Sequence, residues 1–231
     1  MSHRLTAEFL GTAFLVAAVV GSGVMGDRLA NGNVAIALLA NTIATGAALV
    51  AIILAFGPIS GAHLNPAVTL ADAIERGLSW SHASQYAVVQ VLGGVTGSVA
   101  AHLMFDLSPI SLSQHVRTGP AQFLSEFIAT FGLVSVIWGC SRARAGAVPF
   151  AVGAYITAAY WFTASTSFAN PAVTIARSLS DTFAGIRPAD APLFILAQVL
   201  GALAATFLFR WLVPPLSSAA KDVLVRHQGD H

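Results

Sequence analysis

The chain has 231 residues, of which 56% are hydrophobic and only 9% are charged, and its formal net charge is +1. Ordinary soluble domains carry about 25% charged residues, so this composition excludes a water-soluble enzyme and a disordered chain, and the small net charge excludes a nucleic-acid binder. The single cysteine, Cys140, excludes a disulfide framework and a multi-cysteine metal site, which leaves an integral membrane protein.

Charged residues divide the chain into apolar runs, and a helix that crosses a membrane needs about 20 apolar residues. We predict transmembrane helices over residues 5–25, 34–56, 83–105, 121–140, 147–165 and 191–213. Two apolar runs, 29–71 and 145–176, are much longer than one crossing, and each contains an Asn-Pro pair. Their second halves predict re-entrant segments, which exist at membrane depth only beside protein or a water-filled cavity. The two segments therefore predict an aqueous pathway.

Each Asn-Pro pair predicts the start of a short helix, because Asn is a favoured N-cap and Pro fits the first helical position. The half-helices should follow Asn65 and Asn170 and extend to about residues 74 and 179. Their N-termini should meet at the midplane, where free N–H groups and the helix dipoles create a positive potential. The Asn amides could donate there to water or a hydroxylic solute, while cations and protons meet an electrostatic barrier.

Three short blocks recur in the same order in the two halves of the chain. They are Ala7–Thr12 with Ser125–Thr130, His63–Ala71 with Phe168–Ala176, and Gln90–Gly93 with Gln198–Gly201. These blocks predict a duplication over about 4–105 and 121–213. Each repeat holds three crossings, so the two must be inverted relative to each other, as in many channels and transporters. We expect an all-α membrane protein with one channel domain, 1–213, and a polar cytoplasmic tail, 214–231.

Basic residues predict the orientation. With six crossings, both termini share one side with the loops at 72–82 and 141–146. That side carries most of the basic residues, namely Arg4, Arg76, Arg142, Arg144, Arg210, Lys221 and Arg226. An excess of positive charge marks the cytoplasmic side, so we expect cytoplasmic termini in a multi-pass protein of the plasma (inner) membrane.

The sequence resembles the aquaporin and aquaglyceroporin (major intrinsic protein) family over roughly residues 4–213. The motifs that carry the resemblance are two Asn-Pro-Ala boxes and a paired carboxylate near the start of each repeat: Asn65-Pro66-Ala67, Asn170-Pro171-Ala172, Glu8 and Glu126. The resemblance implies six transmembrane helices, two half-helices and a homotetramer.

It also implies that the backbone before each box lines the pore, at Gly61, Ala62, His63, Thr166, Ser167 and Phe168. Each Glu would hold its loop by accepting hydrogen bonds from backbone N–H groups. A proton relay is the alternative role for a carboxylate inside a membrane.

The selectivity filter departs from the family pattern. Most members carry an Arg directly after the second box, where this chain has Val173, and the other positions fall on Thr45 and, counted without gaps, Ala158. A shift of two or three positions would place Ile156, Tyr160 or Trp161 there instead. The small residues predict a wide filter without arginine. Arg177 lies one turn beyond Val173, where it could place a charge in the outer vestibule or pair with Asp181.

This filter resembles that of bacterial aquaglyceroporin-like channels from arsenic-resistance operons. It implies a passive channel for small uncharged solutes, with trivalent metalloids such as arsenous acid or methylarsenite ahead of glycerol-like solutes. The alternatives are a general glycerol, urea and water channel, a poorly conducting structural membrane protein, and a proton-coupled transporter. No nucleophile–base pair or metal-ligand spacing appears, so we expect no enzyme, cofactor or metal site. The expected partners are neutral solutes, water, lipid and further copies of the chain, and not nucleic acid.

Overall fold

A computed structural model describes residues 1–213, and the tail predicted at 214–231 lies outside the described residues. The described part is helical and contains no strand. Its long helices are α1 (Ser2–Leu29), α2 (Val34–Ser60), α4 (Trp80–Met104), α5 (Pro120–Ala143), α6 (Val148–Phe162) and α8 (Ala191–Leu212). The shorter elements are two half-helices, α3 (Pro66–Ile74) and α7 (Pro171–Ser178), and one 3₁₀ turn, η1 (Ala145–Ala147).

Within residues 1–213, six helical segments are long and apolar enough to cross a membrane, with η1 and α6 counted as one. They lie at the six predicted positions, and the half-helices follow Asn65 and Asn170 as predicted. The all-α fold with six long and two short helices is therefore confirmed. Apolar length and Asn-Pro capping are local signals, which explains why they suffice to place these elements.

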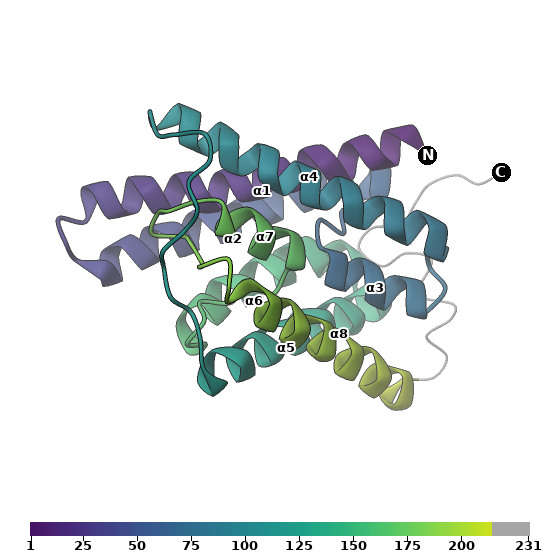
Figure 1. Ribbon diagram of the computed structural model, residues 1–231. Coiled ribbons are helices and arrows are strands. Elements are labelled where there is room, and N and C mark those ends of the chain that lie inside the picture. The colour runs from purple at the N-terminus through teal and green to yellow at the C-terminus, as the bar shows by residue number, and fades with distance from the viewer. Residues whose placement is uncertain (214–231) are drawn as a thin grey trace.

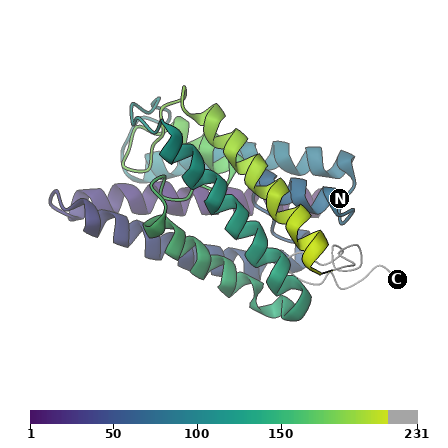
Figure 2. The same cartoon turned by 90° about the horizontal axis from the view of Figure 1, so that it is seen from below.

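The helices of the two repeats pack in matching ways. In the first, α1 packs against α2 and α4, and in the second α5 packs against α6 and α8. Figure 1 shows the half-helices α3 and α7 within this bundle, and Figure 2 shows α5 and α8 side by side. The repeats join where α2 packs on α6, where α7 packs on α4, where α3 packs on α8, and where the two half-helices touch.

Small residues allow the closest helix pairs to form. A Cβ atom added at Gly97 of α4 would collide with the backbone carbonyl of Ala13 in α1, and one at Gly93 would collide with that of Phe9. Gly201 of α8 has the same relation to Phe127 of α5. Helix pairs in membranes commonly use such residues to bring backbones together.

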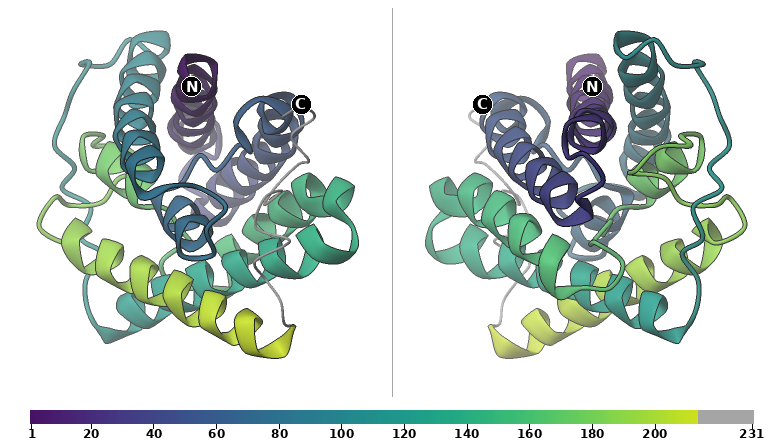
Figure 3. Two further views of the ribbon diagram at one scale, coloured as in Figure 1. Left: turned by 90° about the vertical axis from the view of Figure 1, so that its right-hand side faces the viewer. Right: turned by 90° about the vertical axis from the view of Figure 1, so that its left-hand side faces the viewer.

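The segment 105–119 joins the two repeats and runs along one side of the bundle from α4 to α5 (Figure 3). Its backbone donates from Ser113 to the Ser178 carbonyl, at 3.1 Å, near the end of α7. Its His115 carbonyl accepts from the Arg187 N–H at 2.7 Å. We call the end of the bundle formed by 105–119 and 179–190 the loop face. It lies opposite the end that holds the start of α1 (Figure 1).

Candidate functional site

Each half-helix begins at an asparagine that caps it. The Asn65 Oδ1 atom accepts from the Ala67 N–H at 2.9 Å, and the Asn170 Oδ1 atom accepts from the Ala172 N–H at 3.0 Å. A proline follows each asparagine in the first turn, where its missing N–H costs nothing. The carbonyl side of each amide is thus tied to the backbone of its own half-helix.

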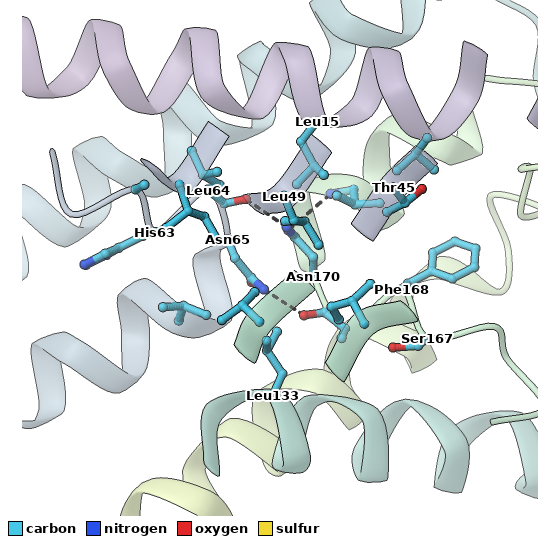
Figure 4. A pocket seen from close by; sticks show the side chains of 18 of the residues that line it. Leu15, Thr45, Leu49, His63, Leu64, Asn65, Leu133, Ser167, Phe168 and Asn170 are labelled. Carbon is cyan, nitrogen blue, oxygen red and sulfur yellow. Dashed lines mark hydrogen bonds between the residues drawn. The ribbon is translucent and has the colours of Figure 1, made fainter. Parts of the chain in front are cut away.

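The nitrogen side of each amide reaches across to the other repeat. Asn65 Nδ2 donates to the Ala169 carbonyl at 2.7 Å, and Asn170 Nδ2 donates to the Leu64 carbonyl at 2.8 Å (Figure 4). The two half-helix N-termini therefore meet, as the sequence predicted, and they are joined by a reciprocal pair of hydrogen bonds, which it did not predict. We call this pair of bonds the clasp. A side-chain amide has two N–H hydrogens, so each asparagine retains one for a solute.

Glu8 is fully buried and holds the first loop. Its carboxylate accepts from the backbone N–H of His63 at 2.9 Å and of Leu64 at 2.7 Å. It also accepts from the Ser60 hydroxyl at 2.6 Å and from Gln90 Nε2 at 2.8 Å. All four of these hydrogen-bond donors belong to the same repeat as Glu8.

Glu126 has the matching environment in the second repeat. It accepts from the backbone N–H groups of Phe168 and Ala169, both at 2.9 Å. Ser165 and Gln198 donate to it at 2.6 Å each. Gln90 and Gln198 recur at matched positions of the two repeats, and this recurrence was the sequence signal for their role beside the carboxylates.

Left-handed backbone lets the two loops point their groups in alternating directions. Ala62 and Leu64 have φ values of 46° and 53°, and the equivalent Ser167 and Ala169 have 51° and 50°. Residues other than glycine seldom adopt this region, and such strain persists where the surroundings fix it. It turns the loop N–H groups toward the glutamates and the Leu64 and Ala169 carbonyls toward the opposite asparagines.

A cavity runs past both asparagines, with His63 toward one end and Thr45 and Phe168 toward the other (Figure 4). Its empty space, counted together with the solvent space at its openings, is about 580 Å³. Most of its wall is aliphatic, contributed by Leu15, Val19, Leu49, Ile53, Val68, Leu133, Ile137, Val152, Ile156 and Val173. The polar groups come mainly from the two loops and the asparagines. An apolar wall with few polar groups is typical of a site for small neutral molecules.

The loops line the cavity over slightly different residues from those expected. Ala62, His63, Ser167 and Phe168 are lining residues, as are the unpredicted Leu64 and Ala169. Gly61 and Thr166, which were also expected, do not line the cavity in the described chain.

The His63 side chain is held within its own loop and half-helix. Its Nδ1 atom lies 3.1 Å from the Thr69 hydroxyl, and its Nε2 atom lies 3.7 Å from an Asp72 carboxylate oxygen. Its ring also packs edge-on against Tyr86, with the centroids 5.4 Å apart. These contacts orient the imidazole, as expected for a side chain that braces its loop.

The prediction of Ala158 as a filter residue is wrong. Ala158 is exposed on the outside of α6, and the side chains that α6 contributes to this part of the cavity are Ile156 and Tyr160. Trp161, the third alternative, is also exposed, at 49%. Each helical residue turns the side chain by about 100°, so an error of two positions moves it to the opposite face.

Thr45 and Val173 do line the cavity, but they are joined by larger neighbours. The Tyr160 hydroxyl lies 3.3 Å from the Thr45 hydroxyl. Arg177 is also a lining residue, so a cavity wall without arginine is not what the structure shows. The alternative pairing of Arg177 with Asp181 is not formed either, since Asp181 accepts from the Gln114 N–H at 2.9 Å.

Known proteins resemble this chain over most of its length. A family model described as "Major intrinsic protein" matches residues 1–167 and 141–229. The chain is 56% identical over 215 residues to "Aquaglyceroporin AqpS" of Rhizobium meliloti (strain 1021), covering 93% of this chain and 92% of that protein. It is 31% identical over 242 residues to "Probable aquaporin AqpM" of Archaeoglobus fulgidus, covering 92% of this chain and 97% of that protein.

A solved structure shares the fold. The X-ray structure of the aquaglyceroporin from Plasmodium falciparum aligns with a TM-score of 0.75, at 21% sequence identity. The alignment covers 94% of this chain and 98% of that one. The likeness therefore extends over the whole helical bundle, half-helices included.

Proposed function

Because the chain belongs to the major intrinsic protein family, as its two Asn-Pro-Ala boxes predicted, we propose that it is a passive channel for small uncharged solutes. Trivalent metalloids such as arsenous acid and methylarsenite are the leading substrates, and glycerol-like solutes come next. A relative that is 56% identical and named an aquaglyceroporin supports the solute class. Such a channel performs no chemistry on its solute, so the protein is not an enzyme.

The observation that carries this proposal is the pair of clasped asparagines inside an apolar cavity. Each amide retains one donor, and both half-helix dipoles place positive potential at the same point. A neutral hydroxylic molecule can accept these bonds, whereas a cation is repelled. The aliphatic wall offers few other groups to hold the molecule, which favours rapid passage over tight binding.

The shape and polarity of these solutes suit the cavity. Arsenous acid is neutral at pH 7 and carries three hydroxyl groups, as glycerol does. Methylarsenite adds an apolar methyl face, which Val173 and Ile156 can contact on the aliphatic side of the cavity. Val173 also stands at the position directly after the second box, where most family members carry an arginine.

The remaining features of the proposal concern the whole assembly. We place residues 1–213 in one channel domain built of inverted repeats, 4–105 and 121–213. The protein would lie in the plasma membrane as a homotetramer with cytoplasmic termini, so that the loop face is extracellular. Exposed aliphatic and aromatic side chains on the long helices, such as Phe14, Leu92 and Phe207, would contact lipid or another copy.

Arsenous acid uptake into proteoliposomes at pH 7 tests the substrate. We expect uptake by the wild type well above that of protein-free vesicles, and uptake close to the vesicle background for Val173→Arg, because the new side chain adds bulk and charge inside the cavity. Val173→Leu is the matched control that adds bulk without charge, and it should retain part of the flux.

Wild-type uptake no faster than that of empty vesicles would exclude this substrate. Glycerol, urea and water flux would then identify a general aquaglyceroporin-like channel, and the absence of all of them would favour a structural membrane protein. Accumulation of solute against its gradient under an applied pH gradient would instead favour a proton-coupled transporter.

A further inference from the structure

Arg177 is a buried cation on the cavity wall, near its loop-face end. The side chain is 2% exposed, and its Nε atom donates to the Ala184 carbonyl. Its Nη1 atom has no hydrogen-bond partner among residues 1–213. Because Arg177 lines the cavity and its buried guanidinium carries a donor without a protein partner, the guanidinium can bind an oxygen atom of a molecule that enters.

Aromatic stacking fixes the position of this guanidinium. Its central carbon lies 3.3 Å from the centroid of the Phe168 ring, and Phe168 itself lines the cavity. A second guanidinium, that of Arg117, lies 5.1 Å from the same centroid. Arg117 is anchored in turn to the Gly185 carbonyl at 2.8 Å and the Ser165 carbonyl at 3.1 Å.

Two acidic residues of the surrounding segments, Glu126 and Asp190, have other partners. Glu126 accepts four bonds from its own loop and from Gln198, and Asp190 binds Arg187 at 2.8 Å. No salt bridge joins Arg177 to an acid within the described chain. Its positive charge is therefore not neutralised by an ion pair and acts on the interior of the cavity.

Tyr160 supplies an aromatic ring to the same part of the wall. It projects from α6, is 3% exposed, and its hydroxyl lies 3.3 Å from that of Thr45 on α2. Arg177 and Tyr160 both line this cavity. Val173, one helical turn before Arg177, adds an apolar surface between the half-helix start and the guanidinium.

We propose that Tyr160 and Arg177 together determine which molecules pass the loop-face end of the pathway. The guanidinium belongs to Arg177, one helical turn after Val173, the residue that directly follows the second box. The aromatic ring belongs to Tyr160 of α6. The Arg177 guanidinium donates to a hydroxyl or carbonyl oxygen of a neutral solute, and its charge repels inorganic cations. The Tyr160 ring limits the cross-section and offers its hydroxyl to the same solute.

This inference rests on the proposed function and names the solute class more closely. The favoured molecule is neutral, small and carries several oxygen acceptors, as polyols and undissociated oxyacids do. Molecules of similar size without acceptors gain nothing from the guanidinium, and cations are excluded before they reach the asparagines.

Selectivity measurements on proteoliposomes test the inference. We would compare wild type, Arg177→Met, Arg177→Lys and Tyr160→Phe for glycerol, water and potassium permeability, after checking each variant by size-exclusion chromatography. For Arg177→Met we expect potassium leak to rise about tenfold or more, and the ratio of glycerol to water flux to fall. Arg177→Lys should keep the cation barrier but lose the preference for glycerol, because a lysine ammonium lacks the planar set of N–H donors that a guanidinium offers to two oxygen atoms at once.

Arg28→Met is the matched control. Arg28 is an exposed arginine near the loop end of α1, where it donates to the Phe105 carbonyl at 2.8 Å and stacks on the Phe105 ring outside the cavity. Its loss should leave all three permeabilities unchanged. Tyr160→Phe should alter the glycerol-to-water ratio without raising cation leak, since the ring and the charge remain.

The possible results distinguish a wrong assignment of Tyr160 and Arg177 from a wrong proposal that the protein is a channel. Wild-type flux of glycerol or water combined with unchanged selectivity in well-folded Arg177 variants would overturn this inference alone. No wild-type flux of either solute would overturn both. If Arg177→Met does not fold, Arg177→Lys and Tyr160→Phe still decide the matter, because unchanged flux ratios in both would contradict the assignment.

Discussion

Glu126→Ala is expected to abolish production of folded protein. The substitution leaves four buried donors without their acceptor: two backbone N–H groups, the Ser165 hydroxyl and the Gln198 amide. Each buried unsatisfied donor costs about 1–3 kcal/mol, and water cannot readily replace the carboxylate inside the bundle. The combined loss is comparable with the whole stability of a typical domain, about 5–15 kcal/mol.

Size-exclusion chromatography and thermal unfolding of detergent-solubilised protein would measure this effect. Glu8→Ala should behave in the same way, because Glu8 holds the first loop with a matching set of bonds. Glu126→Gln should be intermediate, since the amide keeps one acceptor oxygen and adds donors where acceptors are needed. Asp27→Ala, at an exposed position near the end of α1, is the control that should unfold like the wild type.

A different outcome would favour the alternative role of these carboxylates. If Glu126→Gln retained full thermal stability and passive solute flux but lost accumulation driven by a pH gradient, Glu126 would be a proton carrier. The bonding in the structure favours the loop brace, because the donors around each carboxylate come from the loop, its flanking serine and a glutamine. A relay would need an acceptor for the proton among these groups.

Gly97→Ala is expected to lower the thermal stability of the helix bundle sharply. The added Cβ atom would overlap the Ala13 carbonyl oxygen and crowd the Ala13 carbon atoms, all of which are backbone. Backbone cannot move aside by changing a rotamer, so α1 and α4 must separate along their contact. Overpacking of this kind typically costs about 1–3 kcal/mol, and separation of the helices would also disturb the nearby half-helix α7.

Gly139→Ala is the matched substitution within another long helix. A Cβ atom at Gly139 meets only side-chain atoms of Phe209, at 3.6 Å or more, which is ordinary van der Waals contact. Alanine favours helix over glycine by about 1 kcal/mol, so this variant should unfold at the same temperature or higher. Equal unfolding temperatures for Gly97→Ala and the wild type would show that the α1–α4 contact is not tight.

The two loops show how stability and conduction depend on the same bonds. Glu8 fixes the N–H groups of His63 and Leu64, and this leaves the Leu64 carbonyl directed at Asn170. The asparagine that a solute meets is therefore held in place from the opposite repeat. Disturbing either glutamate should affect both the folded yield and the geometry of the central donors.

The amino-acid sequence by itself determined the elements of this protein. Apolar runs long enough to cross a membrane placed the six long helices, and Asn65 and Asn170 placed the half-helices, because length and capping depend on neighbouring residues only. The recurrence of Glu8 as Glu126, and of Gln90 as Gln198, marked the positions that the structure brings together around each loop.

Only the tertiary structure decided which side chains face the cavity. Ala158 and Tyr160 stand two positions apart, and the rotation of α6 against α2 sets which of them turns inward. The clasp of Asn65 on the Ala169 carbonyl joins residues from different repeats, which no local pattern records. Likewise, Arg177 reaches the cavity because Phe168 and Ala184 support its guanidinium there. These features depend on contacts between distant segments, and such contacts exist only once the helices have packed.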